Sequence, residues 1–264
     1  MKPLALIACL LAGPATAHEF WIAPQAHDVP AGGELVADLR VGEKFEGSAF
    51  SYVPPNFTRF EVLMGGTATG VPGRAGDRPA LRMAAPGEGL AIVVHQTREY
   101  ALTYDDWAKF VRFAEHKGFP QVIDRHLARG LPQEAVKERY TRFAKSLIAV
   151  GDGTGADREV GLLTEIVAEA NPYADDLSGG LPVRVLYEGA PRVDAQVELF
   201  DRAPDGSVSV TTARTDAEGR AILAVVPGHS YLADAVVMLE SEPTARNPAA
   251  WQSLWASLTF AVPD

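Results

Sequence analysis

Cysteine is almost absent from this sequence. Its 264 residues include one cysteine, Cys9, which lies in the apolar N-terminal stretch. If that stretch is removed, the remaining chain can form no disulfide and can offer no thiolate to a metal ion. Any metal site would then be built from histidine, carboxylates, backbone carbonyls or the N-terminal amine.

Long apolar runs and an excess of basic residues are also missing. The apolar run at residues 4–11 is too short to span a bilayer, so we expect the protein not to be transmembrane itself. The formal net charge is −10, from 24 Lys and Arg against 34 Asp and Glu, which argues against nucleic acid as a partner. Neither a Gly-x-Ser-x-Gly elbow, a His-Glu-x-x-His motif nor an EF-hand loop occurs, and we expect a protein that is not an enzyme.

Residues 1–17 have the organisation of a secretory signal peptide. Lys2 supplies the positive charge, the apolar run follows, and Ala15-Thr16-Ala17 supplies the small residues that a signal peptidase needs. Cleavage after Ala17 would export the protein and make His18 its first residue. Cys9 also loosely resembles a lipoprotein attachment site, but only eight residues precede it.

Short alternating runs predict an antiparallel β-sandwich from residue 34 onward. Runs at residues 35–41, 59–64 and 89–96 are separated by pairs of proline and glycine residues that favour turns. Residues 105–147 differ, because apolar residues recur there at helical spacing and Asp105-Asp106 can cap a helix. We predict three short helices in this insert, the second beginning at Pro120 and the third running from Pro132 to about residue 147.

A second β pattern follows the Leu-Ser-Gly-Gly segment at residues 177–180, which we interpret as a domain hinge. The strands and turn motifs of this region resemble transthyretin-like and carboxypeptidase-regulatory-like sandwiches. The sequence thus predicts a mainly β protein with two β-sandwich domains, Ig-like or transthyretin-like. Residues 18–178 form the first domain, with the helical insert at about residues 105–147, and residues 179–264 form the second.

Several segments spread along the chain together resemble a known family. They are His18-Glu19-Phe20-Trp21-Ile22, Tyr140-Thr141-Arg142-Phe143-Ala144-Lys145, Glu165-Ile166-Val167, Asn171-Pro172, Thr215-Asp216-Ala217-Glu218-Gly219-Arg220 and Trp255-Ala256-Ser257-Leu258-Thr259-Phe260. In these motifs the chain resembles an exported bacterial family of unknown function that is often labelled a periplasmic component of cobalt or nickel uptake. The resemblance covers nearly the whole mature chain and implies a periplasmic, β-rich, metal-handling protein. It carries over no catalytic residue.

A free N-terminal His18 would offer a metal ion two nitrogen ligands, its α-amine and its imidazole. Nickel, cobalt and copper all suit nitrogen ligands, and the general affinity order favours copper. The best candidate for a further ligand is His95, at the end of an apolar strand, and Glu19 could bind the metal or orient His18. The alternatives are that His95 packs in the core and that His18 is simply where the chain begins.

The remaining histidines fit surface or turn positions better than a metal site. His27 follows Pro24 in a predicted loop, and His229 lies in a Pro-Gly turn. His116 and His126 are ten residues apart in the helical insert, so they do not share one helix face at the spacing that a chelate needs.

The leading hypothesis is a periplasmic, non-enzymatic protein that binds a divalent transition metal through His18, His95 and Glu19. It would assist uptake or delivery of nickel, cobalt or copper, with an inner- or outer-membrane transporter as partner. The alternative is a metal-free scaffold or adhesion module that docks a membrane transporter or receptor through its β-sandwiches. A third hypothesis, an oxidative copper enzyme acting on a polymer, requires a flat exposed face and a second histidine close to His18.

Overall fold

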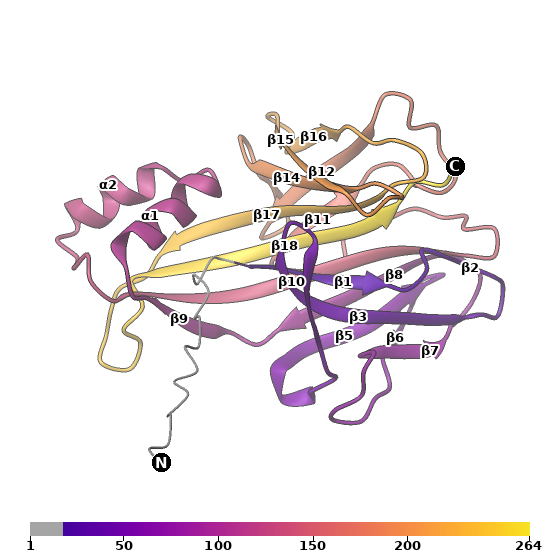
Figure 1. Ribbon diagram of the computed structural model, residues 1–264, viewed down its shortest axis with the longest axis horizontal. Coiled ribbons are helices and arrows are strands. Elements are labelled where there is room, and N and C mark those ends of the chain that lie inside the picture. The colour runs from indigo at the N-terminus through magenta and orange to yellow at the C-terminus, as the bar shows by residue number, and fades with distance from the viewer. Residues whose placement is uncertain (1–17) are drawn as a thin grey trace, which may run out of the picture.

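The computed structural model describes residues 18–264, which form a mainly β protein with two helices (Figure 1). The predicted signal peptide, residues 1–17, lies outside the described residues. The strands are β1 (Glu19–Pro24), β2 (Asp28–Val29), β3 (Glu34–Glu43), β4 (Glu46–Phe50), β5 (Phe57–Met64), β6 (Thr67–Gly70), β7 (Leu81–Ala84), β8 (Gly89–Thr97), β9 (Tyr100–Tyr104), β10 (Val136–Val150), β11 (Thr164–Ala168), β12 (Leu181–Tyr187), β13 (Ala190–Pro191), β14 (Gln196–Arg202), β15 (Val208–Arg214), β16 (Arg220–Leu223), β17 (Ser230–Glu240) and β18 (Trp251–Ala261). The helices are α1 (Trp107–His116) and α2 (Gln121–Ala128), with a 3-10 turn at Pro54–Asn56.

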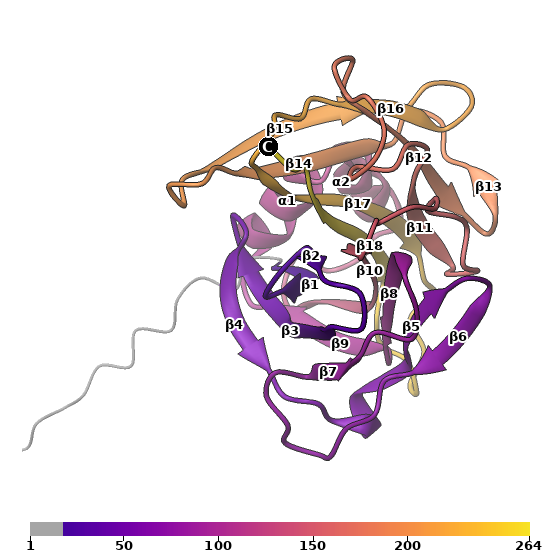
Figure 2. The ribbon, with the colours of Figure 1, turned by 90° about the vertical axis from the view of Figure 1, so that its right-hand side faces the viewer.

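These strands form three sheets that pack as β-sandwiches. The largest sheet has ten strands, in the order β15-β14-β17-β18-β10-β8-β5-β6, and β2 and β9 also pair with β10. One four-stranded sheet contains β1, β3, β4 and β7, and the other contains β11, β12, β13 and β16. Figure 2 shows the two sandwich regions one above the other, with β1, β3, β4 and β7 in the lower region and β12, β14, β15 and β16 in the upper one. Within residues 18–264, no helix is both long and apolar enough to cross a membrane.

Strand β8 explains how one large sheet supports both sandwich regions. Successive residues of a strand point to opposite faces of the sheet. Ala91 and Val93 therefore enter the core under β1, β3 and β7, whereas Leu90 and Ile92 enter the core under β11, β12 and β16. Because both faces are buried, the strand reads in the sequence as a continuous apolar run.

The two helices cover one end of the long strands β17 and β18 (Figure 1). Phe110 and Phe113 of α1 pack with Trp251 and Trp255 of β18. The carboxylate of Asp106 accepts a hydrogen bond from the backbone N–H of Ala108 at 2.9 Å and so caps α1, which confirms the predicted start of this helix.

The third predicted helix is wrong, because residues 136–150 form the long central strand β10. Ala135, just before it, has a φ of 50°, which does not continue a right-handed helix. β10 pairs with β18 on one side and with β8 and β9 on the other, and both of its faces are buried over much of its length. The helical insert therefore ends near residue 128 and not at residue 147. Periodicity alone does not separate such a doubly buried strand from a helix.

The predicted boundary at residues 178 and 179 falls between β11 and β12, which pair in one sheet, and it also cuts across the largest sheet. β14, β15, β17 and β18 come from the predicted second domain, yet they belong to the same ten-stranded sheet as β5, β8 and β10. The parallel pairing of β10 with β18 makes this connection over nine residue pairs, from Glu138↔Trp251 to Ser146↔Thr259. Independent folding of the two segments stays a prediction.

Candidate functional site

A cavity of about 660 Å³ opens beside the first residues of β1, and we call it the β1–β10 pocket. Its volume lies in the range typical of small-molecule sites. Glu138, Tyr140 and Arg142 line it from β10, because alternate residues of a strand share one face. The pocket is further lined by His18, which directly precedes β1, by Phe20 of β1, by Ser48, Ala49 and Phe50 of β4, and by His95 and Thr97 of β8.

His95 is buried in an aromatic environment at the pocket wall. Its side chain contacts Phe20, Phe57 and Phe60, with ring centroids 5.1, 5.4 and 5.0 Å away. Burial lowers the pKa of His95 to about 3, so the imidazole is neutral at physiological pH. Its Nδ1 atom is buried without a hydrogen-bond partner, which is unusual for a polar group in a core.

Arg142 brings a positive charge to the same pocket. Its guanidinium carbon lies 4.8 Å from the ring centre of Tyr140 and 5.8 Å from that of Phe20. Nη2 donates a hydrogen bond to the backbone oxygen of His18 at 3.0 Å, whereas Nε is buried without a partner. Burial lowers the pKa of Arg142, and in residues 18–264 no carboxylate forms an ion pair with it within 4.0 Å.

Glu138 is the one acidic residue that lines this pocket within the described chain, and it is fully buried. Its carboxylate accepts hydrogen bonds from the hydroxyl of Tyr104 at 2.7 Å and from the hydroxyl of Ser253. Burial raises the pKa of Glu138 to about 7, against the lowering effect of these two donors and of Arg142. Glu138 is therefore only partly ionised near neutral pH, and the pocket holds less negative charge than an ordinary carboxylate would give.

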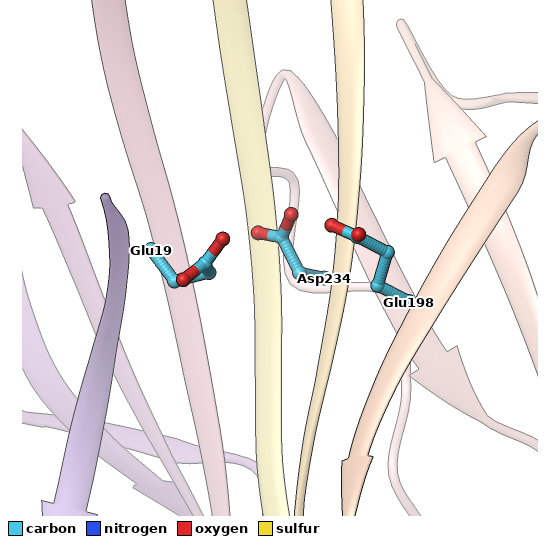
Figure 3. A group of neighbouring side chains, drawn as sticks. All are labelled: Glu19, Glu198 and Asp234. Carbon is cyan, nitrogen blue, oxygen red and sulfur yellow. The ribbon is translucent and has the colours of Figure 1, made fainter. Parts of the chain in front are cut away.

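A second polar group, which we call the Lys117 cluster, lies on the opposite face of β1. The carboxylates of Glu19, Glu198 and Asp234 come from β1, β14 and β17 and point toward one another (Figure 3). The Lys117 ammonium, at the end of α1, lies 2.9 Å from Glu19 and 3.0 Å from Asp234 and also contacts Glu198. An ammonium group thus occupies the position in which these three carboxylates could hold a metal ion.

The charges of the Lys117 cluster stabilise one another. Burial alone would lower the pKa of Lys117, but the carboxylates of Asp234, Glu19 and Glu198 raise it above its usual range. Burial raises the pKa of Asp234 to about 7, although Lys117 acts against this. His116 also contacts the cluster, since its Nε2 atom lies 2.9 Å from Glu198, and this hydrogen bond raises the pKa of His116. The cluster fixes the end of α1 to three strands.

The structure brings two of the three predicted metal-site residues to one pocket. His18 and His95 both line the β1–β10 pocket, and the His18 side chain is 40% exposed, with Nε2 4.0 Å from Glu43. Glu19 faces the other way, because consecutive residues of β1 alternate between the two faces. Within residues 18–264, the one group of three histidine or acidic side chains with ligand atoms within 4.8 Å of one another is Glu19, Glu198 and Asp234. Metal binding by His18 and His95 stays a prediction.

The surface position predicted for His126 is wrong. His126 is buried under Trp107 and Trp251, accepting a hydrogen bond at Nδ1 from the Trp251 indole at 3.0 Å, because this face of α2 packs on β18. His27 lies within 3.4 Å of the backbone oxygen of Leu147 and is also partly buried. His229 pairs with Asp201 at 2.6 Å.

Several residues of these two sites were not among the sequence predictions: Arg142, Glu138, Lys117, Glu198 and Asp234. For two of them the sequence contained a signal, an acidic residue within an apolar run. Asp234 interrupts the apolar run of β17, and Glu198 interrupts that of β14. Such a charge inside a doubly buried strand needs a partner of opposite charge. No comparable signal exists for Lys117, which lies in a polar stretch at the end of α1.

The fold and the pocket together define a β-sandwich protein with a cavity and a separate buried cluster in which three carboxylates surround one ammonium. The chain belongs to the family described as a domain of unknown function (DUF4198), which matches residues 15–238. The part of the family resemblance that concerns an uncharacterised family is therefore confirmed, and its label of metal uptake is not tested by this match. No curated protein matches the chain.

Two solved structures match most of this chain with low structural similarity. One is a tetra-tandem repeat in the extending region of a large adhesion protein, with 11% identity and a TM-score of 0.20. The match covers 92% of this chain and 49% of that one. The other is the D0-D1 domain of intimin, with 15% identity and a TM-score of 0.22, and the match covers 92% of this chain and 97% of that one. This chain thus spans about half the length of the adhesion repeat structure, and TM-scores this low support no functional argument.

Proposed function

We propose that this protein is an exported, non-enzymatic binding module, and that the β1–β10 pocket is its recognition site. The observation that carries this proposal is the pairing of a cavity of about 660 Å³ with two buried polar atoms that lack partners, Arg142 Nε and His95 Nδ1. Unpaired buried donors and acceptors cost free energy unless a ligand satisfies them. The proposal shares with the scaffold alternative an exported module without a metal ion, but it assigns recognition to a cavity of small-molecule size.

Several features support a binding role over catalysis. His95 is neutral and enclosed by aromatic rings, so it is poorly placed to transfer protons near neutral pH. Glu138 is held by two hydroxyl donors and is not free to act as a base. The pocket lining combines aromatic side chains with a few polar groups, as is typical of small-molecule and cofactor sites.

The test is to fill the pocket and measure ligand or partner binding. In an Ala49→Trp variant, the indole would occupy the cavity from β4 and abolish binding of aromatic small molecules, as followed by protein-detected NMR. The matched control is Thr212→Trp on the exposed edge strand β15, which should bind as the unmodified protein does. Equal binding by both variants would overturn the assignment of the pocket.

A second candidate function is binding of nickel, cobalt or copper by His18 with His95. The observation that favours it is that both histidines line one pocket and that the Nδ1 atom of His95 has no partner. The experiment is a calorimetric metal titration of protein that begins at His18, compared with a variant that carries one extra residue before it. Tight binding that disappears on extension supports this function, and equal affinities would exclude an N-terminal site.

A further inference from the structure

The charge of the β1–β10 pocket is opposite to the charge of the whole chain. The chain has a formal net charge of −10, yet the pocket is lined by two arginines, Arg78 and Arg142, and by a single carboxylate. Its one acidic residue among those described, Glu138, is shielded by two hydroxyl donors. A positively charged recess on an acidic protein favours an anion over a cation as occupant.

Arg142 has free hydrogen-bonding capacity at the inner wall of this pocket. Of its guanidinium nitrogens, Nη2 donates to the backbone oxygen of His18, Nε is buried without a partner, and in residues 18–264 Nη1 has no hydrogen-bond acceptor. Three carboxylates interact electrostatically with Arg142. Asp234 and Glu19 are both in contact with Lys117, and Glu138 accepts hydrogen bonds from Tyr104 and Ser253. Nε and Nη1 lie on different edges of the guanidinium, but Nη2 carries a second N–H group besides the one given to His18. One edge with two N–H donors therefore remains for the two oxygens of a carboxylate.

The remaining walls are aromatic and aliphatic. Phe20, Phe57 and Tyr140 line the interior of the pocket, and Phe50 lies half exposed at its rim. Tyr140 also stacks on Tyr100, with ring centroids 5.5 Å apart, so the aromatic surface is continuous. Such walls favour an apolar ligand body and disfavour a strongly hydrated dianion.

We propose that the β1–β10 pocket binds a ligand that joins a carboxylate to an aromatic or aliphatic body, with Arg142 holding the carboxylate and the aromatic walls holding the body. This inference rests on the proposed function, since it names the ligand class of the same pocket. A free aryl-alkanoic acid is a simple member of this ligand class. Metal binding by the imidazoles is a separate proposal.

The experiment compares 3-phenylpropionate with its uncharged amide, 3-phenylpropionamide, by calorimetry and by ligand-detected NMR on the unmodified protein starting at His18. The acid should bind about tenfold or more tightly than the amide, because a charge-assisted hydrogen-bond pair exceeds a neutral one. Equal affinities would overturn the carboxylate inference and leave the pocket assignment intact. No binding of either probe would overturn the pocket assignment itself. Tighter binding of phenyl phosphate than of the acid would replace the carboxylate with a phosphate and so overturn the inference.

An Arg142→Met variant should lose the preference for the acid and keep the affinity for the amide. The matched control is Arg139→Met on the same strand, because Arg139 pairs with Glu99 outside this pocket. A preference that persists in Arg142→Met would contradict the role of Arg142. If Arg142→Met does not fold, as judged by circular dichroism, the comparison of acid and amide on the unmodified protein decides the inference alone.

Discussion

Two buried cations lie on either side of β1, and they differ in what surrounds them. Lys117 contacts the carboxylates of Glu19, Glu198 and Asp234, so its charge is paired within the protein. Arg142 contacts aromatic rings and one backbone oxygen, and within the described residues it has no carboxylate in ion-pair distance. The same strand thus separates an internally neutralised charge from one with unused hydrogen-bond donors.

This difference separates a structural role from a binding role. A buried cation that is fully paired contributes to holding its elements together, and removing it leaves uncompensated carboxylates. A partly buried cation whose N–H donors lack partners has lost its hydration without gaining hydrogen bonds. An anionic ligand that accepts from these donors can offset this loss of free energy. A substitution of Lys117 should therefore lower stability, whereas a substitution of Arg142 should weaken ligand binding and change stability little.

Removal of the Lys117 ammonium is expected to have the largest effect. Lys117→Met leaves three buried carboxylates without their central cation, and the free energy of unfolding should fall by about 3–5 kcal/mol. Urea unfolding followed by circular dichroism measures this. The control is Lys109→Met on the same helix, whose solvent-exposed pair with Asp105 should contribute little to stability. A similar small loss in both variants would contradict a structural role for the Lys117 cluster.

Glu138 should make stability depend on pH. Burial raises its pKa from 4.5 to about 7, so between these values the folded protein holds a proton that the unfolded chain releases. Stability should accordingly fall as pH rises through this window, by up to about 3 kcal/mol. Glu138→Gln should remove this part of the slope and be more stable than the parent at pH 8, as measured by urea unfolding across the window. The exposed Glu99→Gln is the control, and parallel curves for Glu138→Gln and the parent would argue against the raised pKa.

His95 should act on stability in the opposite pH direction. Burial lowers its pKa from 6.5 to about 3, so the unfolded chain binds a proton in this window that the folded protein does not. Stability is lost as pH falls, and His95→Phe should recover on the order of 2 kcal/mol near pH 4. Acid unfolding followed by circular dichroism checks this, and His229→Phe serves as a control at a partly exposed site. Coincident acid transitions for His95→Phe and the parent would contradict the burial argument.

Arg142→Met should have the smallest effect on stability. Because Arg142 has no paired carboxylate, its loss should change the free energy of unfolding by less than about 1 kcal/mol, in contrast to Lys117→Met. The same urea titration makes the comparison. A loss as large as that of Lys117→Met would show that Arg142 is structural and would remove the contrast between the two faces of β1.

The sequence predicted the sandwich fold well where strands alternate or carry clear turns between them. The runs at residues 35–41, 59–64 and 89–96 became β3, β5 and β8, and the Asp106 cap was correct. It failed at β10, where burial of both faces conceals the two-residue period and pairing with distant strands outweighs local pattern.

The candidate site was harder to predict because its residues meet through long-range pairing. His18 and His95 were named and line one pocket, whereas Glu19 was assigned to the same site although strand alternation places it on the opposite face. Arg142 and Glu138 were hidden by the incorrect helix, since a helix would not have placed residues 138, 140 and 142 on one side. Lys117 meets its carboxylates across 81 to 117 positions of sequence, which no local motif records.

The contrast between the paired Lys117 and the unpaired Arg142 is tested most directly by NMR. The measurement follows the resonance of the Arg142 Nε–H group during titration with 3-phenylpropionate. A carboxylate that binds the open guanidinium donors should shift this resonance downfield and slow its exchange with water, while the Lys117 ammonium stays unchanged. An Arg142 Nε–H resonance that does not move at saturating ligand would contradict the claim that the unpaired cation on this face of β1 is the recognition group.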